Sequence, residues 1–400
     1  MRLFFNSLAA SAGGGLTYIR NVLPHLALEP GLEVTVALPP GLKEEFRRLS
    51  NIEFLELATT PTGRFRYEQS SLPEVLRRGR FDVLLSAGNF ALRRSPVPQI
   101  LLSRNSIYTS GDFYRDLIAR REYRAWWDTR LRGLMAKRSV GWADITVAPS
   151  EAFAAELRRW TGARNVVAIH HGFDPETFSR DTTPLPAEVE EKLCAAGGSF
   201  RLLLVSHYNY YRNFETIIRA LPLIRDRLAG RTVRLLLTCR LAAGENPGAY
   251  RAEGAANLAR ELGVQDLLVE LGPVPYRVLH HLYRRADAYV TAAYTETFAH
   301  PLVEAMSCGL PVAASDLPVH REICGDAAVY FSKFSPQELT DQVVLLASSP
   351  DLCGSLSRNG MKQAQGFSWD AHCKELLSLM YKLHAARMLR ERKTSLPKVR

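Results

Sequence analysis

The chain has 400 residues, of which 46% are hydrophobic and 23% charged, a globular composition long enough for two domains. This composition excludes a wholly disordered, a collagen-like or a multi-span membrane protein. The formal net charge of +10 favours an anionic partner, but no RNA-recognition or zinc-finger signature runs through the basic segments, so no nucleic acid is expected.

Cysteine usage and the first residues bear on the compartment. The 6 cysteines have no C-x-x-C spacing, which favours a reducing cytosol over a disulfide scaffold or a zinc site. The apolar run at the start is interrupted by Asn6 and Ser7, too early for a signal-peptide core, and we interpret it as a first strand. We therefore expect a cytoplasmic protein.

Apolar runs of strand length alternate with segments of helical period along the whole chain, a pattern typical of parallel sheets covered by helices on both faces. The predicted strands are 2–5, 33–38, 53–57, 82–86, 99–102, 145–148 and 166–169 in the first half, and 200–206, 233–239, 267–271, 288–292, 311–314 and 327–331 in the second. The prediction is α/β, with two Rossmann-like, doubly wound parallel-sheet domains facing across a cleft.

Turn residues indicate the domain boundaries. Residues 1–174 are expected to form an N-terminal domain, and 175–198, rich in Pro and Gly, a linker. Residues 199–366 are expected to form the second domain. A C-terminal helix over 367–392 is expected to pack back toward the N-terminal domain, followed by a basic tail, 393–400.

A glycine-rich turn follows the first strand, before a helical pattern. A dinucleotide-binding motif is disfavoured, because Tyr18 stands where the third small residue belongs and Glu33 begins its strand instead of ending it. The free N–H groups at Gly14 and Gly15 are then candidates to bind a phosphate or sugar oxygen at a helix start. The alternative is a tight strand-to-helix turn without a ligand.

Two glutamates, Glu296 and Glu304, follow a strand in the second half, with Pro301 at a helix start and Gly309 at its end. We expect Glu304 in the opening turn, where the helix dipole favours a carboxylate whose two oxygens can accept both hydroxyls of a ribose. Glu296 lies on the preceding loop, within reach of a group beyond the phosphates. The alternative is a pair of glutamates with only a structural role.

Further motifs accompany the two glutamates of E-x7-E (Glu296 and Glu304): E-A-M-S-C-G-L-P-V-A-A-S-D (304–316), E-I-C-G-D-A-A (322–328), L-G-P-V (271–274), L-Y-R-R-A-D-A-Y-V (282–290), F-S-W (367–369), A-D-I-T-V-A-P-S-E (143–151) and I-H-H-G-F-D (169–174). With these motifs, nearly the whole chain resembles the GT-B glycosyltransferases, specifically their retaining family 4.

The resemblance implies a role for each matching residue. Glu304 would hold the ribose and Glu296 the donor sugar, while the amides around Phe298, Ala299 and His300 would face the sugar and the phosphates. Such a protein binds a nucleotide-diphosphate sugar as its donor substrate and needs no separate cofactor. The resemblance also implies that 1–174 is the acceptor-side domain and 199–366 the nucleotide-sugar-binding domain.

The chain departs from the family at two places. The family has a basic pair after the first strand of the second domain; here Arg212 matches one cation, and Ser206 and His207 occupy the stretch where the other is absent. Many relatives also carry a histidine after the strand 99–102, where this chain has Ser103, Arg104 and Asn105. We take Asn105 as a catalytic candidate that can hydrogen-bond a sugar hydroxyl.

These features predict a retaining, metal-independent glycosyltransferase that moves a mannose- or glucose-like hexose to a glycan or glycolipid acceptor in surface polysaccharide synthesis. No D-x-D motif and no metal-ligand spacing occur, so no metal site is expected. The alternatives are a degenerate GT-B protein that binds nucleotide or glycan in an assembly, and a nucleotide-sugar epimerase.

The segment 115–138 mixes eight cations with Trp126 and Trp127. This composition is consistent with a helix that contacts anionic lipid or receives a lipid-linked acceptor, so peripheral contact with the inner face of the plasma membrane is one expectation. A docked helix with a solvated charged face is the other.

Overall fold

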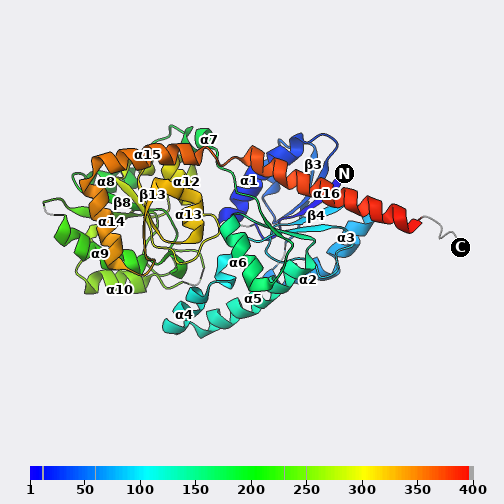
Figure 1. Ribbon diagram of the computed structural model, residues 1–400, viewed down its shortest axis with the longest axis horizontal. Coiled ribbons are helices and arrows are strands. Elements are labelled where there is room, and N and C mark those ends of the chain that lie inside the picture. The colour runs from blue at the N-terminus through cyan, green and yellow to red at the C-terminus, as the bar shows by residue number, and fades with distance from the viewer. Residues whose placement is uncertain (11–12, 59, 229, 249, 396–400) are drawn as a thin grey trace. The chain divides into compact units, whose positions relative to one another are not determined.

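The structure is a computed structural model that describes residues 1–10, 13–58, 60–228, 230–248 and 250–395 (Figure 1). The chain folds into two compact units. The first unit contains residues 1–109, 124–172 and the segment from Trp369 onward, and the second contains residues 110–123 and 173–368. Each unit is therefore assembled from segments that are distant in the sequence.

Within the described residues, the first unit holds one parallel sheet with the strand order β3-β2-β1-β4-β5-β6-β7. The strands are Arg2–Asn6 (β1), Glu33–Leu38 (β2), Ile52–Glu56 (β3), Val83–Ser86 (β4), Gln99–Leu102 (β5), Ile145–Ala148 (β6) and Val166–Ala168 (β7). The α-helices are Gly13–Leu28 (α1), Pro61–Ser70 (α2), Leu72–Arg78 (α3), Tyr123–Trp142 (α5), Glu151–Thr161 (α6) and Trp369–Ser395 (α16).

Alternate residues of β1 point to opposite faces of this sheet, and helices cover both faces. Leu3 and Phe5 share one apolar cluster with residues of α1 and α16, whereas Phe4 packs in a second cluster with residues of α3. α16 lies beside α1 (Figure 1), where the Tyr18 hydroxyl is 2.8 Å from His372 Nε2. The C-terminal helix is therefore part of the first unit's core.

The second unit has a parallel sheet whose described strands follow the order β10-β9-β8-β11-β12-β13. They are Phe200–Leu204 (β8), Val233–Leu237 (β9), Leu268–Glu270 (β10), Ala288–Thr291 (β11), Val312–Ser315 (β12) and Ala328–Phe331 (β13). Its α-helices are Gly111–Ala119 (α4), Pro175–Ser179 (α7), Ala187–Ala195 (α8), Phe214–Arg227 (α9), Glu253–Glu261 (α10), His280–Arg285 (α11), His300–Ser307 (α12), Pro318–Cys324 (α13), Pro336–Ser348 (α14) and Pro350–Ala364 (α15).

The predicted fold class, two Rossmann-like parallel-sheet domains, is confirmed. Each predicted strand corresponds to one of β1 to β13, and the observed bounds differ from the predicted ones by at most two residues. Among the described residues, no helix has both the length and the apolar composition needed to cross a membrane.

The units divide the chain differently from the predicted domains. The expected linker, 175–198, contains α7 and α8 and belongs to the second unit, which begins at Phe173. α4, which the sequence places in the first domain, also belongs to the second unit. The reason is a set of ion pairs, hydrogen bonds and aromatic contacts between α4 and residues 210–333, which a local sequence pattern does not reveal.

Candidate functional site

The candidate site lies at the carboxyl ends of the two central strands of the second sheet. β8 and β11 are neighbours there, and their sequence order reverses between them, which makes this edge the topological switch point where open α/β sheets bind ligands. The loop after β8 ends in the 3₁₀-turn Tyr210–Arg212, and the loop after β11 carries Glu296.

Arg212 and Glu296 form an ion pair across this switch point. Their side chains are 18% and 11% exposed, so the pair is largely removed from solvent. The other oxygen of Glu296 accepts a 2.9 Å hydrogen bond from the amide of Thr297. Burial alone would raise the pKa of Glu296, but Arg212 and this amide hold it below its usual value. Glu296 is therefore ionised at neutral pH and fixed in place by its cation.

Two residues with left-handed backbone conformation border the pair. Asn213 has φ 55° and Ala299 has φ 65°, values that are uncommon for residues other than glycine and that often mark functional sites. The Asn213 amide group donates to the carbonyl oxygens of Ala292, at 3.1 Å, and Lys333, at 2.6 Å, and so ties three loops together.

Ala299 precedes α12 and offers no side-chain oxygen to the amides of its first turn. Those N–H groups are the ones that bind anions at helix starts. The left-handed residue also sets where α12 begins: at His300, one residue before Pro301.

Glu304 is buried on α12 and has tyrosines as partners instead of a cation. It is only 4% exposed, and the Tyr283 hydroxyl donates a 2.7 Å hydrogen bond to its Oε2. Burial raises the pKa of Glu304 to about 7, although hydrogen bonds from Tyr283 and Tyr276 oppose the rise. Glu304 is the fifth residue of α12, so the prediction that it lies in the first turn is wrong.

His320, which the sequence analysis did not single out, lies near the ion pair. Its imidazole is completely buried, and its Nδ1 donates to the carbonyl oxygen of Ser315 at 2.8 Å. Burial lowers the pKa of His320 to about 4, and the ring interacts electrostatically with Glu296 and Arg212. Its Nε2 is buried and has no hydrogen-bond partner among the described residues, so a neutral acceptor atom remains beside the pair.

The other predicted donor-binding residues of this unit lie on the same loops. The amide of Ser206 donates to Thr238 at 3.0 Å, and its hydroxyl donates to the carbonyl oxygen of His207 at 2.7 Å. Phe298 is buried, and its ring centroid is 4.8 Å from that of His300. The structure therefore gathers Arg212, Glu296 and these residues at one edge of the second sheet.

The remaining predicted residues lie in the first unit. Gly14 and Gly15 are in the first turn of α1, and a Cβ on Gly15 would lie 3.2 Å from the Cα of Ala10, so only glycine fits there without a shift. Asn105 accepts a hydrogen bond from the amide of Ile107 at 3.3 Å and caps the 3₁₀-turn Ser106–Tyr108. Its side chain thus has a local structural role.

Arg104, next to Asn105, is the better-anchored polar side chain of this edge. Its guanidinium lies 4.7 Å from the centroid of the Tyr18 ring and donates to the carbonyl oxygens of Ala87, at 2.9 Å, and Gly14, at 3.4 Å. Its own amide donates to Asn89 Oδ1 at 2.7 Å. These contacts place a cation behind the glycines, at the carboxyl ends of β1, β4 and β5.

A polar network joins α4 to the loops of the second unit, and the sequence analysis missed it. Arg120 binds Asp116 at 2.7 Å and Glu215 at 2.9 Å, and its guanidinium lies 4.2 Å from the centroid of the Tyr210 ring. The Tyr294 hydroxyl donates to Asp116 at 2.8 Å. Tyr294 is two residues before Glu296, so α4 buttresses the loop that carries the catalytic candidate.

In the described part of the chain, no group of three or more His, Cys, Asp or Glu side chains is arranged to hold a metal ion. The fixed positive charge available at the switch point is Arg212, whose Nε is buried and lacks a hydrogen-bond partner among the described residues.

Two family models match the chain. The description "Glycosyltransferase Family 4" matches residues 12–177, and "Glycosyl transferases group 1" matches residues 188–363. Together the two matches cover most of both units.

Curated relatives are similar over different lengths. A D-inositol 3-phosphate glycosyltransferase of Corynebacterium aurimucosum is 27% identical over 62% of this chain, and the matched part spans 59% of the relative's length. The protein with the same name from Thermobispora bispora is 25% identical over 91% of this chain and 89% of its own length.

Solved structures share the fold. Sucrose-phosphate synthase from Thermosynechococcus elongatus aligns with a TM-score of 0.74 at 18% identity, covering 96% of this chain and all of that one. Anabaena HepE in complex with UDP and glucose aligns with a TM-score of 0.70 at 16% identity, with the same coverage.

Proposed function

The chain belongs to the GT-B glycosyltransferases, and from that premise we propose that it transfers a hexose from a nucleoside diphosphate sugar to a glycan or lipid-linked acceptor, with retention at the anomeric carbon and without a metal ion. The observation that carries the proposal is the buried Arg212–Glu296 pair at the switch point, with Glu304 on the following helix. The expected donor sugar is glucose- or mannose-like.

In this proposal Glu304 receives the ribose. Both of its oxygens accept hydrogen bonds when it is ionised, which matches two vicinal hydroxyls. The Tyr283 and Tyr276 hydroxyls already donate to this carboxyl. The ribose hydroxyls would therefore bind alongside these tyrosines or displace them. Because the pKa of Glu304 is about 7, nucleotide binding releases a proton near neutral pH.

Arg212 and the first turn of α12 face the diphosphate. When the bond between the anomeric carbon and the phosphate oxygen breaks, negative charge grows on that oxygen, and prearranged donors lower the barrier most. Glu296 holds the guanidinium of Arg212 in place for this purpose. This cation supports transfer without a metal ion.

Glu296 is proposed to accept a hydrogen bond from the donor sugar as well. Its lowered pKa keeps it an acceptor throughout, so it positions the sugar and does not act as a proton donor. The acceptor hydroxyl attacks the anomeric carbon from the face that the diphosphate leaves, and its proton passes to the departing phosphate oxygen. Ser206, His207, Gly14, Gly15 and Asn105 remain candidates for further contacts with the donor.

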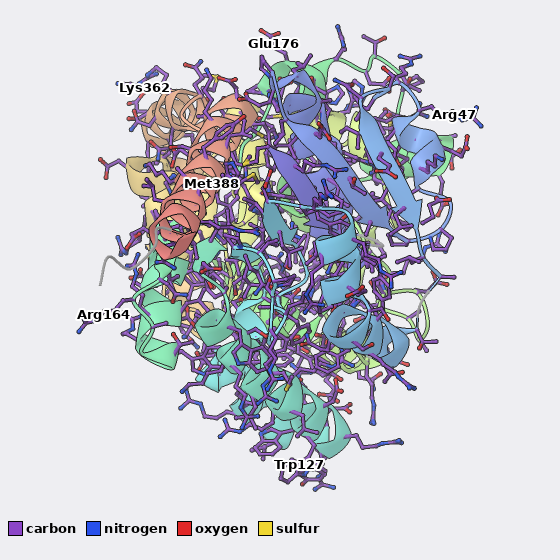
Figure 2. All side chains as sticks on the ribbon, turned by 90° about the vertical axis from the view of Figure 1, so that its right-hand side faces the viewer. Arg47, Trp127, Arg164, Glu176, Lys362 and Met388 are labelled. Atoms are coloured by element: carbon purple, nitrogen blue, oxygen red, sulfur yellow. The ribbon has the colours of Figure 1, made fainter. Side chains whose placement is uncertain are left out.

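A surface of α5 favours a lipid-linked acceptor. Four exposed apolar residues repeat along one face of this helix: Tyr123, Trp127, Leu131 and Leu134. Arg124 flanks this stripe on one side, and Arg130 and Lys137 flank it on the other. Arg138 continues the line of the stripe beyond Leu134. Trp127, 62% exposed, projects outward from the helix (Figure 2). An apolar stripe between cations fits the interface of an anionic membrane, such as the inner face of the plasma membrane.

A thermal-shift panel of UDP, GDP, ADP and their sugars tests the donor assignment. A nucleotide at 100 times its Kd should stabilise the fold by about 2.7 kcal/mol, and one base should stand out. Release or transfer of sugar then supports the transferase. Binding without any turnover favours the degenerate GT-B alternative, conversion of the donor without an acceptor favours the epimerase, and no stabilisation by any nucleotide contradicts the proposal.

The membrane assignment has a matched pair of variants. Leu131→Ala removes an exposed leucine from the stripe, and Leu345→Ala removes one from α14 in the second unit. Co-sedimentation with phosphatidylglycerol vesicles should fall for Leu131→Ala and, by about tenfold, for Trp127→Ala, while Leu345→Ala matches the native protein. Equal binding by all variants would contradict the assignment.

A further inference from the structure

A cavity of about 570 Å³ lies in the second unit, between α4 and the loops that follow β8, β11 and β13. α4 contributes Asp112 and Asp116 to its wall, and the loops contribute Asn213, Tyr294 and Phe334. Its size is within the range of small-molecule sites, about 300–1,000 Å³. Neither Arg212 nor Glu296 lines it, although Asn213 and Tyr294 belong to the same two loops as that pair.

Each charge that lines this α4 pocket is paired: three cations face the two carboxylates of the wall and Glu215, which lies behind it. Lys333 and Arg115 both form ion pairs with Asp112. Arg120 is bound by Asp116 and by Glu215, just behind the wall. A strongly charged ligand would have to break one of these pairs, and an inorganic anion would also approach two carboxylates. The pocket therefore favours a ligand without net charge.

The same walls are rich in hydrogen-bonding capacity. Each ionised carboxylate has about four lone-pair sites, and the described contacts of Asp112 and Asp116 leave some of them available. The guanidinium groups of Arg115 and Arg120 at the border add donors. A ligand with many hydroxyl groups can use such acceptors and donors together.

One apolar surface completes the pocket. The Phe334 side chain is 52% exposed, three residues after the end of β13. The buried Tyr294 ring supports it, with the centroids 5.5 Å apart and the planes tilted by 37°. Tyr294 is itself held by its hydrogen bond to Asp116. Phe334 is thus an aromatic ring held in place at the edge of a polar site whose charged groups are paired with one another.

We propose that the α4 pocket binds a neutral saccharide, whose apolar C–H face lies on Phe334 and whose hydroxyls bond to Asp112 and Asp116. This function is separate from the proposed transfer reaction, and its test needs only binding. Through this site the protein would bind a glycan chain whether or not a nucleotide is bound.

The test is saturation-transfer NMR and calorimetry on the full chain, with maltotriose, α-mannotriose and chitotriose as probes. At least one trisaccharide should bind to the native protein. Phe334→Ala should weaken that binding about tenfold, because the stacking surface is lost, whereas Phe334→Trp should retain it. Phe65→Ala, which removes a partly exposed phenylalanine from α2 of the first unit, serves as the matched control.

Three results would overturn the proposal. The first is that none of the trisaccharides binds to the native protein. The second is that Phe334→Ala, with an unchanged melting temperature, binds the saccharide as well as Phe65→Ala does. The third is that inorganic phosphate displaces the saccharide from the native protein, since that would make the pocket an anion site.

Discussion

The two glutamates of the second unit are eight residues apart and both buried, yet they differ in protonation. Glu296 pairs with Arg212 and has a lowered pKa, while Glu304 faces Tyr283 and Tyr276 and has a pKa of about 7. The comparison shows that the partner, and not burial alone, decides whether a carboxyl group is charged. A cation makes Glu296 a permanent acceptor, whereas phenol groups leave Glu304 able to take up a proton.

The largest effect is expected from Glu296→Gln, because it leaves the guanidinium of Arg212 without its anion in a site largely shielded from solvent. We expect the free energy of unfolding to fall by about 3 kcal/mol and sugar transfer by at least a hundredfold. Urea titration at pH 7 and an initial-rate assay measure the two losses.

The double variant Glu296→Gln/Arg212→Met separates charge from packing. It should recover much of the lost stability while transfer stays low. Glu74→Gln, which breaks an exposed ion pair on α3, is the matched control and should lose far less stability. If Glu296→Gln is no less stable than Glu74→Gln, the Arg212–Glu296 pair does not contribute to stability as predicted.

Glu304→Gln should have an effect of similar size on stability, but in the opposite direction. The raised pKa means that the folded protein binds more protons than the unfolded chain between pH 4.5 and 7, so native stability falls as the pH rises through that window. Glu304→Gln has no group that titrates at this position, so its stability should not show this decrease. At pH 8 it should be more stable than the native protein by about 3 kcal/mol.

Chemical unfolding at pH 4.5, 6 and 8 checks this prediction through the difference between the variant and the native protein, which cancels contributions from other groups. The difference should be small at pH 4.5 and grow up to about pH 7. A constant difference would show that the two tyrosines keep Glu304 ionised.

Nucleotide affinity should depend on pH for the same reason. Below pH 7 the nucleotide must displace a proton from Glu304, so the affinity of the nucleotide chosen by the thermal-shift panel should rise by up to about tenfold from pH 6 to pH 8. Calorimetry in two buffers of different ionisation enthalpy should detect proton release. Glu304→Gln should bind weakly at both pH values, and a flat native profile would argue against Glu304 as the ribose ligand.

The smallest effect is expected from Tyr283→Phe, which removes the 2.7 Å hydrogen bond to Glu304. The pKa of Glu304 should rise further, and the fold should lose about 1–2 kcal/mol at pH 8. At pH 5, where Glu304 is protonated, the loss should be smaller. Equal losses at both pH values would assign the effect to packing of the ring.

The repeating strand pattern was sufficient to predict both sheets and the switch-point loops. It placed Arg212 and Glu296 at the carboxyl ends of β8 and β11 because parallel strands align those ends at one edge. It did not predict that the two side chains pair, since 84 residues separate them and loop geometry decides the contact.

Three features required the structure. The turn of α12 that carries Glu304 depends on the left-handed Ala299, which no propensity favours. The protonation of Glu304 depends on Tyr283. Tyr283 belongs to one of the family motifs, but the sequence analysis assigned no function to it. The membership of α4 in the second unit depends on Arg120, Asp116 and their distant partners.

The placement of α4 has a practical consequence for dividing this protein. The polypeptide passes between the two units four times, so no single cut separates them. A gene split between Gly172 and Phe173 would strip Glu215 and Tyr294 of their α4 partners in one fragment and leave the other with an unsupported helix. Chimaeras that exchange donor specificity between homologues must therefore transplant residues 110–123 together with residues 173–368.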